Sequence, residues 1–170
     1  MKRLSISGNG RYFMQEDKPF FWLADTGWLI FGNLTEEEAA VYLKNRAEKG
    51  FNVIQAVLVY STKELETINK MDWKAADIVD TPEYWAYVEK IVSMAEQLGL
   101  YMALLPSWGS LVKNHLITDE NVCAYVDFLA ERFAKYDNII WAFDHSCILQ
   151  FTGYCPGVVS SYDINLYRSL

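Results

Sequence analysis

The sequence predicts an α/β fold in which parallel β/α units form roughly half of a TIM barrel, preceded by an N-terminal β-hairpin. Two observations indicate the parallel β/α units. Short apolar runs typical of strands alternate with longer segments whose apolar residues recur at helical spacing, as in a parallel sheet with right-handed crossovers. Residues 47–53 and 95–101 also match in kind, because each passes from a helical stripe through a glycine into an apolar run.

The hairpin is expected over residues 3–15, because two short strand-like runs flank residues 8–10 (Gly-Asn-Gly), which tolerate positive φ. Residues 20–25 then form a nearly continuous apolar run that ends in Asp25. Such a run predicts a first strand of the main sheet that is buried on both faces.

A helix is expected to begin at Thr35, because a threonine hydroxyl can cap free amides and three glutamates follow it. Gly50 ends that helix, and Gly99 ends the next one. Strands are expected after the three helices, at residues 52–59, 100–105 and 138–143. The residues predicted on the buried helix faces are Ala40, Leu43, Ala47 and Phe51, then Tyr84, Val88, Ile91, Ala95 and Leu98, then Val122, Tyr125, Leu129, Phe133 and Tyr136.

Two architectures fit this order of elements: an open doubly wound sheet and part of a (β/α) barrel. Residues 25–28 (Asp-Thr-Gly-Trp) follow the first strand where a nucleotide-binding doubly wound fold carries its glycine-rich phosphate loop. Because these residues do not form a glycine-rich phosphate loop, the main sequence evidence for a nucleotide-binding doubly wound fold is absent.

The chain divides by composition into a predicted partial barrel, residues 1–144, and an atypical tail, residues 145–170. The tail holds only two formally charged residues, Asp163 and Arg168, and no clear helical stripe. A frameshifted or disordered end would explain this break, and so would an ordinary irregular C-terminal extension. Both interpretations stay open.

Composition narrows the choice of partners and location. The net charge of −7 disfavours nucleic acid and anionic membranes as partners. The basic start is followed by polar residues, and no run approaches the roughly 18 apolar residues of a membrane span, so we expect a cytoplasmic protein with reduced thiols. Three cysteines without a Cys-x-x-Cys pair, with only two histidines, predict no metal site.

Ligands of parallel α/β sheets bind beyond the carboxyl ends of the strands. The candidates at these ends are Asp25, Thr26 and Trp28 after the first strand, residues 55–60 (from Gln55 to Tyr60) on and after the second, Ser107 and Trp108 after the third, and Asp144 and His145 after the fourth. Carboxylates, an amide and tryptophans at one rim suit a carbohydrate, which offers hydroxyls to polar groups and C–H faces to rings. Asp144 has the position of a general acid, whereas Asp25 fits a loop-bracing role as well as ligand contact.

Three motifs give a more specific indication: residues 18–28 (KPFFWLADTGW), 46–55 (RAEKGFNVIQ) and 104–109 (LLPSWG). In this order they resemble the N-terminal half of the apiosidase-like (β/α)8 barrel domain of glycoside hydrolase family 140 and its relatives. The resemblance implies a retaining-type hydrolase of plant cell-wall glycans such as apiose-bearing pectin, without metal or organic cofactor. It also implies that Asp25, Trp28, Gln55 and Trp108 line the substrate pocket.

The resemblance departs at the fourth strand. Members follow Ile-Ile-Trp with two residues and then Gly-Gly-Asp, whose acid is the acid/base, whereas Asp144 here stands earlier in the run 142–145 (Ala-Phe-Asp-His). The nucleophile of such barrels belongs to a later strand. We therefore expect a truncated catalytic domain that is inactive alone. The alternatives are a non-catalytic carbohydrate-binding domain or a non-functional remnant.

The sequence also predicts self-association, because the edges of the first and fourth strands would expose unpaired backbone groups.

Overall fold

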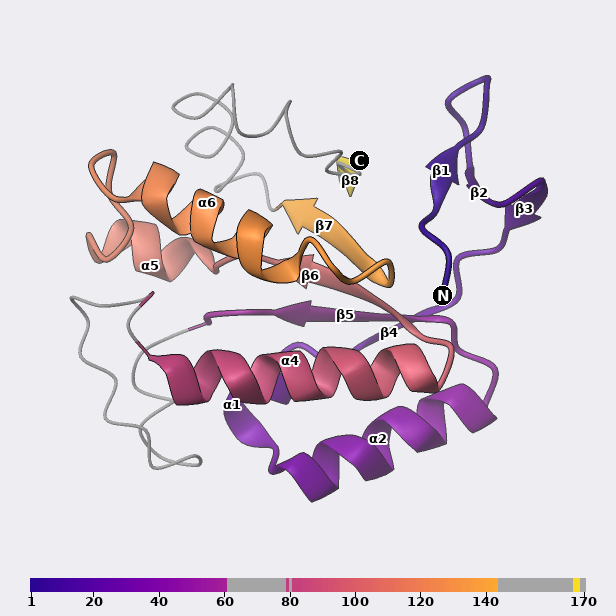
Figure 1. Ribbon diagram of the computed structural model, residues 1–170, viewed down its shortest axis with the longest axis horizontal. Coiled ribbons are helices and arrows are strands. Elements are labelled where there is room, and N and C mark those ends of the chain that lie inside the picture. Colours follow the sequence, from indigo (N-terminus) through magenta and orange to yellow (C-terminus); the bar gives the residue numbers. More distant parts are fainter. Residues whose placement is uncertain (61–78, 80, 144–166, 169–170) are drawn as a thin grey trace.

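Four parallel strands lie side by side in the order in which they occur along the chain (Figure 1). They are β4 (Ala24–Thr26), β5 (Val53–Val57), β6 (Tyr101–Leu105) and β7 (Ile139–Phe143). A two-residue strand, β8 (Tyr167–Arg168), pairs in parallel with the last two residues of β7. The computed structural model describes residues 1–60, 79, 81–143 and 167–168.

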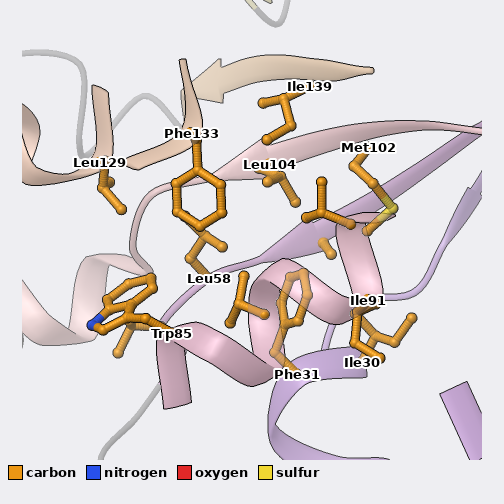
Figure 2. Packing of buried hydrophobic residues seen from close by; sticks show 14 of the residues in the cluster. Ile30, Phe31, Leu58, Trp85, Ile91, Met102, Leu104, Leu129, Phe133 and Ile139 are labelled. Carbon is orange, nitrogen blue, oxygen red and sulfur yellow. The ribbon is translucent and has the colours of Figure 1, made fainter. Parts of the chain in front are cut away.

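Five helices connect these strands within the described residues: α1 (Ile30–Asn33), α2 (Glu36–Glu48), α4 (Pro82–Gln97), α5 (Gly109–Lys113) and α6 (Val122–Phe133). Their buried side chains meet one face of the sheet and form the main core with alternate strand residues (Figure 2). Leu58, Met102 and Leu104 contribute from the strand segments, and Phe31, Trp85 and Phe133 from the helices or their ends.

The opposite face of the sheet carries different side chains. Val53, Tyr101 and Ile140 form one cluster there, and Val57, Leu105 and Ala142 form another, with no residue of α1, α2, α4 or α6 in either. A doubly wound sheet has helices on both faces and a strand order that reverses. Helices on one face and strands in sequential order instead characterise a barrel. The predicted half-barrel is confirmed, and the doubly wound alternative is excluded.

A separate antiparallel sheet caps the amino ends of the main strands. It consists of β1 (Ser5–Ile6), β2 (Phe13–Gln15) and β3 (Lys18–Phe20). The predicted hairpin is its first pair, β1 with β2, and β3 is an addition. Tyr101, at the start of β6, accepts a hydrogen bond of 2.9 Å from Gln15 Nε2, and its ring lies edge-on 5.3 Å from that of Phe20. These contacts join the antiparallel sheet to the amino end of β6.

The first strand of the main sheet departs from its prediction. The apolar run 20–25 is divided, since Phe20 ends β3 and β4 begins only at Ala24. Phe21 lies between them with 78% of its surface exposed, so burial on both faces is wrong. The side chain of Asn52 holds this linker, because Nδ2 donates to the Phe21 carbonyl and Oδ1 accepts from the Leu23 amide. The Leu23 carbonyl also accepts from the backbone amides of Asn52 and Val53, so the linker is bonded both to this side chain and to the start of β5.

The two matching helix-to-strand junctions have the same backbone geometry. Gly50 and Gly99 have φ of 85° and 74°, a left-handed conformation that favours glycine. After α2, the amides of Gly50 and Phe51 donate to the carbonyls of Ala47 and Arg46. After α4, Gly99 and the next residue donate in the same pattern, which is the Schellman motif. The sequence repeat therefore encodes one repeated helix stop.

Helix α2 begins as its sequence predicts. The Thr35 hydroxyl accepts from the Glu38 amide at 3.3 Å, and Glu38 Oε2 accepts from the Thr35 amide at 2.9 Å, which completes a capping box. We expect Thr35→Ala to lower the free energy of unfolding by about 1 kcal/mol, because the Glu38 amide loses its acceptor. Urea denaturation would measure this loss, and Thr35→Ser, which keeps the hydroxyl, is the control. Equal losses in both variants would show that the cap does not contribute.

The predicted helix faces are largely correct, with two shifts. In α2 the fully buried residues are Ala39 and Leu43, and Ala40 is only partly buried. Leu98 is 37% exposed because α4 ends at Gln97 and Leu98 is its C-cap. A one-residue error in a helix end is enough to move a terminal residue off the buried face.

The structure also bears on three further predictions, which concern the cysteines, membrane-spanning helices and the edges of the sheet. Cys123 on α6 is disulfide-bonded, so reduced thiols are the wrong expectation for this residue. No helix among the described residues has the length and apolar character needed to span a membrane. The sequence predicts unpaired edges at the first and fourth strands. The edge of β7 is instead partly paired, because β8 pairs with Ala142 and Phe143, whereas among the described strands β4 pairs with β5 alone.

Candidate functional site

Three aromatic rings gather where β4, β5 and β6 end, and we call Trp28, Tyr60 and Trp108 the rim aromatic group. The rings of Trp28 and Trp108 meet edge-on, with centroids 5.1 Å apart and an interplanar angle of 79°. Tyr60 stacks on Trp108, with centroids 5.7 Å apart and an angle of 23°. All three are partly exposed. Each ring follows a different strand, so the parallel sheet itself brings them together.

Backbone hydrogen bonds fix the segments that carry these rings. The Val57 amide donates to the Trp28 carbonyl at 3.1 Å, and the Trp108 amide donates to the Val59 carbonyl at 3.0 Å. The Ser110 hydroxyl donates to the Tyr60 carbonyl at 3.0 Å. Beneath the rings lies an apolar layer of Val57, Leu105 and Ala142. The rings therefore stand on a packed floor and not on independent loops.

Gln55 lies on the same face of the sheet as this floor. Side chains alternate between the two faces of a strand, so Gln55 shares its face with Val53 and Val57. In the register of the sheet it is level with Thr26 on β4 and Ala103 on β6. Its partly buried amide is thus one layer below Val57, on the side of the rim aromatic group. An amide there adds a hydrogen-bond donor and an acceptor to an otherwise apolar surface.

Asp25 lies on the other face. It is level with Ile54, which packs in the helix-covered core, and its Oδ2 accepts a hydrogen bond of 2.9 Å from the Tyr42 hydroxyl on α2. Arg46, one turn further along α2, forms an ion pair with the same oxygen. The structure therefore brings Trp28, Gln55 and Trp108 to one side and places Asp25 between β4 and α2. Its contacts are those of the bracing role that the sequence left open.

The surroundings of Asp25 change its titration. Burial opposes ionisation, but hydrogen bonds from Tyr42 and the Thr26 amide, together with the charge of Arg46, outweigh it and lower the pKa of Asp25. Burial and the hydrogen bond to Asp25 raise the pKa of Tyr42 to about 12. Tyr42 therefore remains a protonated donor, and Asp25 an ionised acceptor, at neutral pH.

This shift predicts a pH dependence of stability. A carboxyl whose pKa is lower folded than unfolded stabilises the fold fully above its unfolded pKa, ordinarily 3.8, and loses this contribution as pH falls through the folded pKa. We expect Asp25→Asn to be less stable than the wild type by a constant amount from about pH 5 to 7, and the difference to shrink below about pH 4. Urea denaturation across this range measures it. A difference that does not shrink in acid would contradict the pairing.

Asp144, predicted as the general acid, lies outside the described residues. It follows β7 directly in the sequence. Among the described residues, no group of three or more His, Cys, Asp or Glu side chains could hold a metal ion.

Tyr60 belongs to the site; it ends the run 55–60 that the strand-end rule selects, but the resemblance does not single it out. The sequence did contain a signal, because Tyr60 follows the second strand in the position where rim residues occur. What it lacked was the register of β5 against β6, which places Tyr60 over Trp108.

Comparison with known proteins agrees with this geometry. The model of the apiosidase-like catalytic domain family matches residues 7–144. A glycoside hydrolase family 5 protein from Bacteroides vulgatus ATCC 8482 is 27% identical, with a TM-score of 0.79 over 96% of this chain and 38% of that chain. A protein described as a glycoside hydrolase is 28% identical, with a TM-score of 0.76 over 97% of this chain and 40% of that chain.

An exo-β-1,4-mannosidase from Opitutaceae bacterium strain TAV5, at 12% identity, shares the fold alone, with a TM-score of 0.64 over 93% of this chain and 33% of that chain. No curated protein matches the chain. The chain spans about two fifths of the length of the first two solved relatives. With the family model matching 138 of its 170 residues, the chain belongs to the apiosidase-like catalytic domain family and is a glycoside hydrolase-like catalytic domain.

Proposed function

We propose that this chain forms the part of a glycoside hydrolase that binds the sugar, with a plant cell-wall glycan such as apiose-bearing pectin as its substrate. The rim aromatic group is the observation that carries the proposal. Partly exposed rings above an apolar floor can pack on the C–H face of a sugar, and the amide of Gln55 can exchange hydrogen bonds with its hydroxyls. The family membership supports the hydrolase class, and the apiosidase-like description supports a pectic substrate.

We further propose that a polypeptide of these 170 residues binds sugar but does not cleave it. Glycoside hydrolysis of the retaining kind needs two carboxyl groups about 5 Å apart. Asp144 is the proposed acid/base. Asp25 is a poor choice for its partner, because its carboxylate is paired with Arg46 and hydrogen-bonded by Tyr42 on the helix-covered side of β4. The proposed nucleophile therefore comes from a later β/α unit.

Calorimetry with a pectic oligosaccharide, together with assays on aryl glycosides and the same oligosaccharide, tests both parts. Binding without hydrolysis is the expected result. Hydrolysis that Asp144→Asn abolishes would show that the chain is active alone and would overturn the second part. Absence of binding by a cooperatively folded chain would overturn the first.

The free edge of β4 supports a proposal about association. Among the described strands β4 has a neighbour on one side only, which leaves backbone donors and acceptors available to a second chain. We expect the 170-residue polypeptide to self-associate, and size-exclusion chromatography with light scattering at several concentrations measures this. A monomer at all concentrations would contradict it.

A further inference from the structure

Helix α2 is linked to the rim aromatic group through a short series of contacts. Tyr42 and Arg46 lie one turn apart on α2 and both reach Asp25 Oδ2, Tyr42 by a hydrogen bond and Arg46 by an ion pair. The Arg46 guanidinium also lies 5.0 Å from the centroid of the Tyr42 ring, which restricts the direction of that ring. The Tyr42 hydroxyl is therefore fixed from two sides.

The same hydroxyl packs against the backbone at Gly27. A Cβ placed on Gly27 would lie 3.0 Å from Tyr42 Oη and 3.0 Å from Ile54 Cγ2, closer than side-chain carbons normally approach. Gly27 is thus held between α2 and β5, and no other residue type fits there without displacement. This close approach explains the glycine in the run 25–28 better than a need for unusual backbone angles does, since its φ is not positive.

Gly27 is the residue directly before Trp28. The Gly27 carbonyl accepts from the Ile30 amide at 3.0 Å, and the Trp28 carbonyl accepts from the Val57 amide at 3.1 Å, so the turn between β4 and α1 has little freedom. A shift of Gly27 would be transmitted to the Trp28 ring, which meets Trp108 edge-on at 5.1 Å.

We propose that Tyr42 is a positioning residue: its hydroxyl, held by Asp25, fixes Gly27 and thereby sets the orientation of Trp28 against Trp108. Tyr42 lies on the helix-covered side of the sheet and acts on the ligand through Trp28. The consequence for sugar affinity rests on the proposed function of the rim aromatic group, whereas the consequence for ring orientation does not.

Tyr42→Phe tests this with the least disturbance, because it keeps the ring and removes only the hydroxyl. The matched control is Tyr101→Phe, which also removes a hydroxyl that bonds across elements, at the amino end of the strands. Fluorine NMR of protein labelled with fluorotryptophan reports on each of the six tryptophans, assigned by single Trp→Phe variants. We expect Tyr42→Phe to move or broaden the resonances of Trp28 and Trp108, and Tyr101→Phe to move that of Trp22, which packs in the Tyr101 cluster.

Calorimetry with unlabelled protein and a pectic oligosaccharide measures the second consequence. We expect Tyr42→Phe to weaken sugar binding about fivefold, the factor that corresponds to one neutral hydrogen bond. Tyr101→Phe should leave the affinity unchanged, although it lowers stability. A general loss of stability would not distinguish the two variants in this way.

The outcomes separate this inference from the proposed function. Unchanged Trp28 and Trp108 resonances in Tyr42→Phe would overturn the positioning role, whatever the sugar affinity. Moved resonances in a protein that binds no sugar would support the positioning role and overturn the proposed function. Moved resonances with undiminished sugar affinity would show that ring orientation does not govern binding.

Discussion

Replacing Trp85 with alanine is expected to lower the free energy of unfolding by about 3–5 kcal/mol, the range for loss of a buried aromatic ring. Trp85 on α4 has no exposed surface. Its ring centroid lies 5.2 Å from that of Tyr84 and 5.1 Å from that of Phe128 on α6, both edge-on. The indole thus packs between α4 and α6 in the main core, in which Figure 2 also labels Leu58, Leu129 and Phe133. Alanine would leave a cavity that these rings can close only in part.

Urea denaturation followed by circular dichroism measures this effect, provided that the free energy of unfolding falls with urea concentration at the same slope as in the wild type. Val41→Ala is the control, because Val41 lies on the neighbouring helix α2 with 71% of its surface exposed and should change stability by less than about 0.5 kcal/mol. Trp85→Phe, which keeps a ring, should fall between the two. A loss below about 1 kcal/mol in Trp85→Ala would show that the core is not organised around the indole.

The parts of the fold that the sequence predicts well are those with local physical signals. Thr35 with its following glutamates, and Gly50 and Gly99 with their left-handed backbone, determine where helices begin and end through bonds within a few residues. The apolar stripe of α6 is equally local, and its predicted residues Val122, Leu129 and Phe133 are buried. Such signals depend on neighbouring residues in the chain and not on distant pairing partners.

The first strand was predicted less well because its outcome depends on distant residues. The run 20–25 has no period that separates one strand from two, and the division at Phe21 is stabilised by Asn52, far along the chain. Strand β8 likewise exists only through pairing with β7. A strand whose formation depends on partners remote in sequence cannot be predicted from its own residues alone.

The same reason explains why the candidate site was predicted in part. The rule that ligands bind at the carboxyl ends of strands led to Trp28 and Trp108, which the structure places in contact. It could not assign Asp25 to a face, because neighbouring residues on a strand point to opposite sides and a shift of one residue reverses them. The register that pairs Asp25 with Ile54 decides the question, and it directs the carboxylate to α2.

If the rim aromatic group binds sugar, Trp108→Ala should weaken that binding by about 30-fold or more, as expected when a central aromatic contact of about 2 kcal/mol is removed. Trp108 is the ring that joins the group, since it meets Trp28 edge-on and stacks on Tyr60. Its loss would remove one sugar-facing surface and release the other two rings. Calorimetric titration with a pectic oligosaccharide measures the change in affinity.

Trp108 also packs in the core, so its loss must be separated from a loss of folding. Trp22→Ala is the matched control: Trp22 stacks on Phe13, with centroids 5.4 Å apart, in the cluster at the amino ends of the strands. Both variants remove an indole and should unfold at lower urea concentrations than the wild type, but only Trp108→Ala should lose affinity under conditions in which both remain folded. Equal affinity losses in the two variants would mean that sugar binding reports global stability and not contact with the rim.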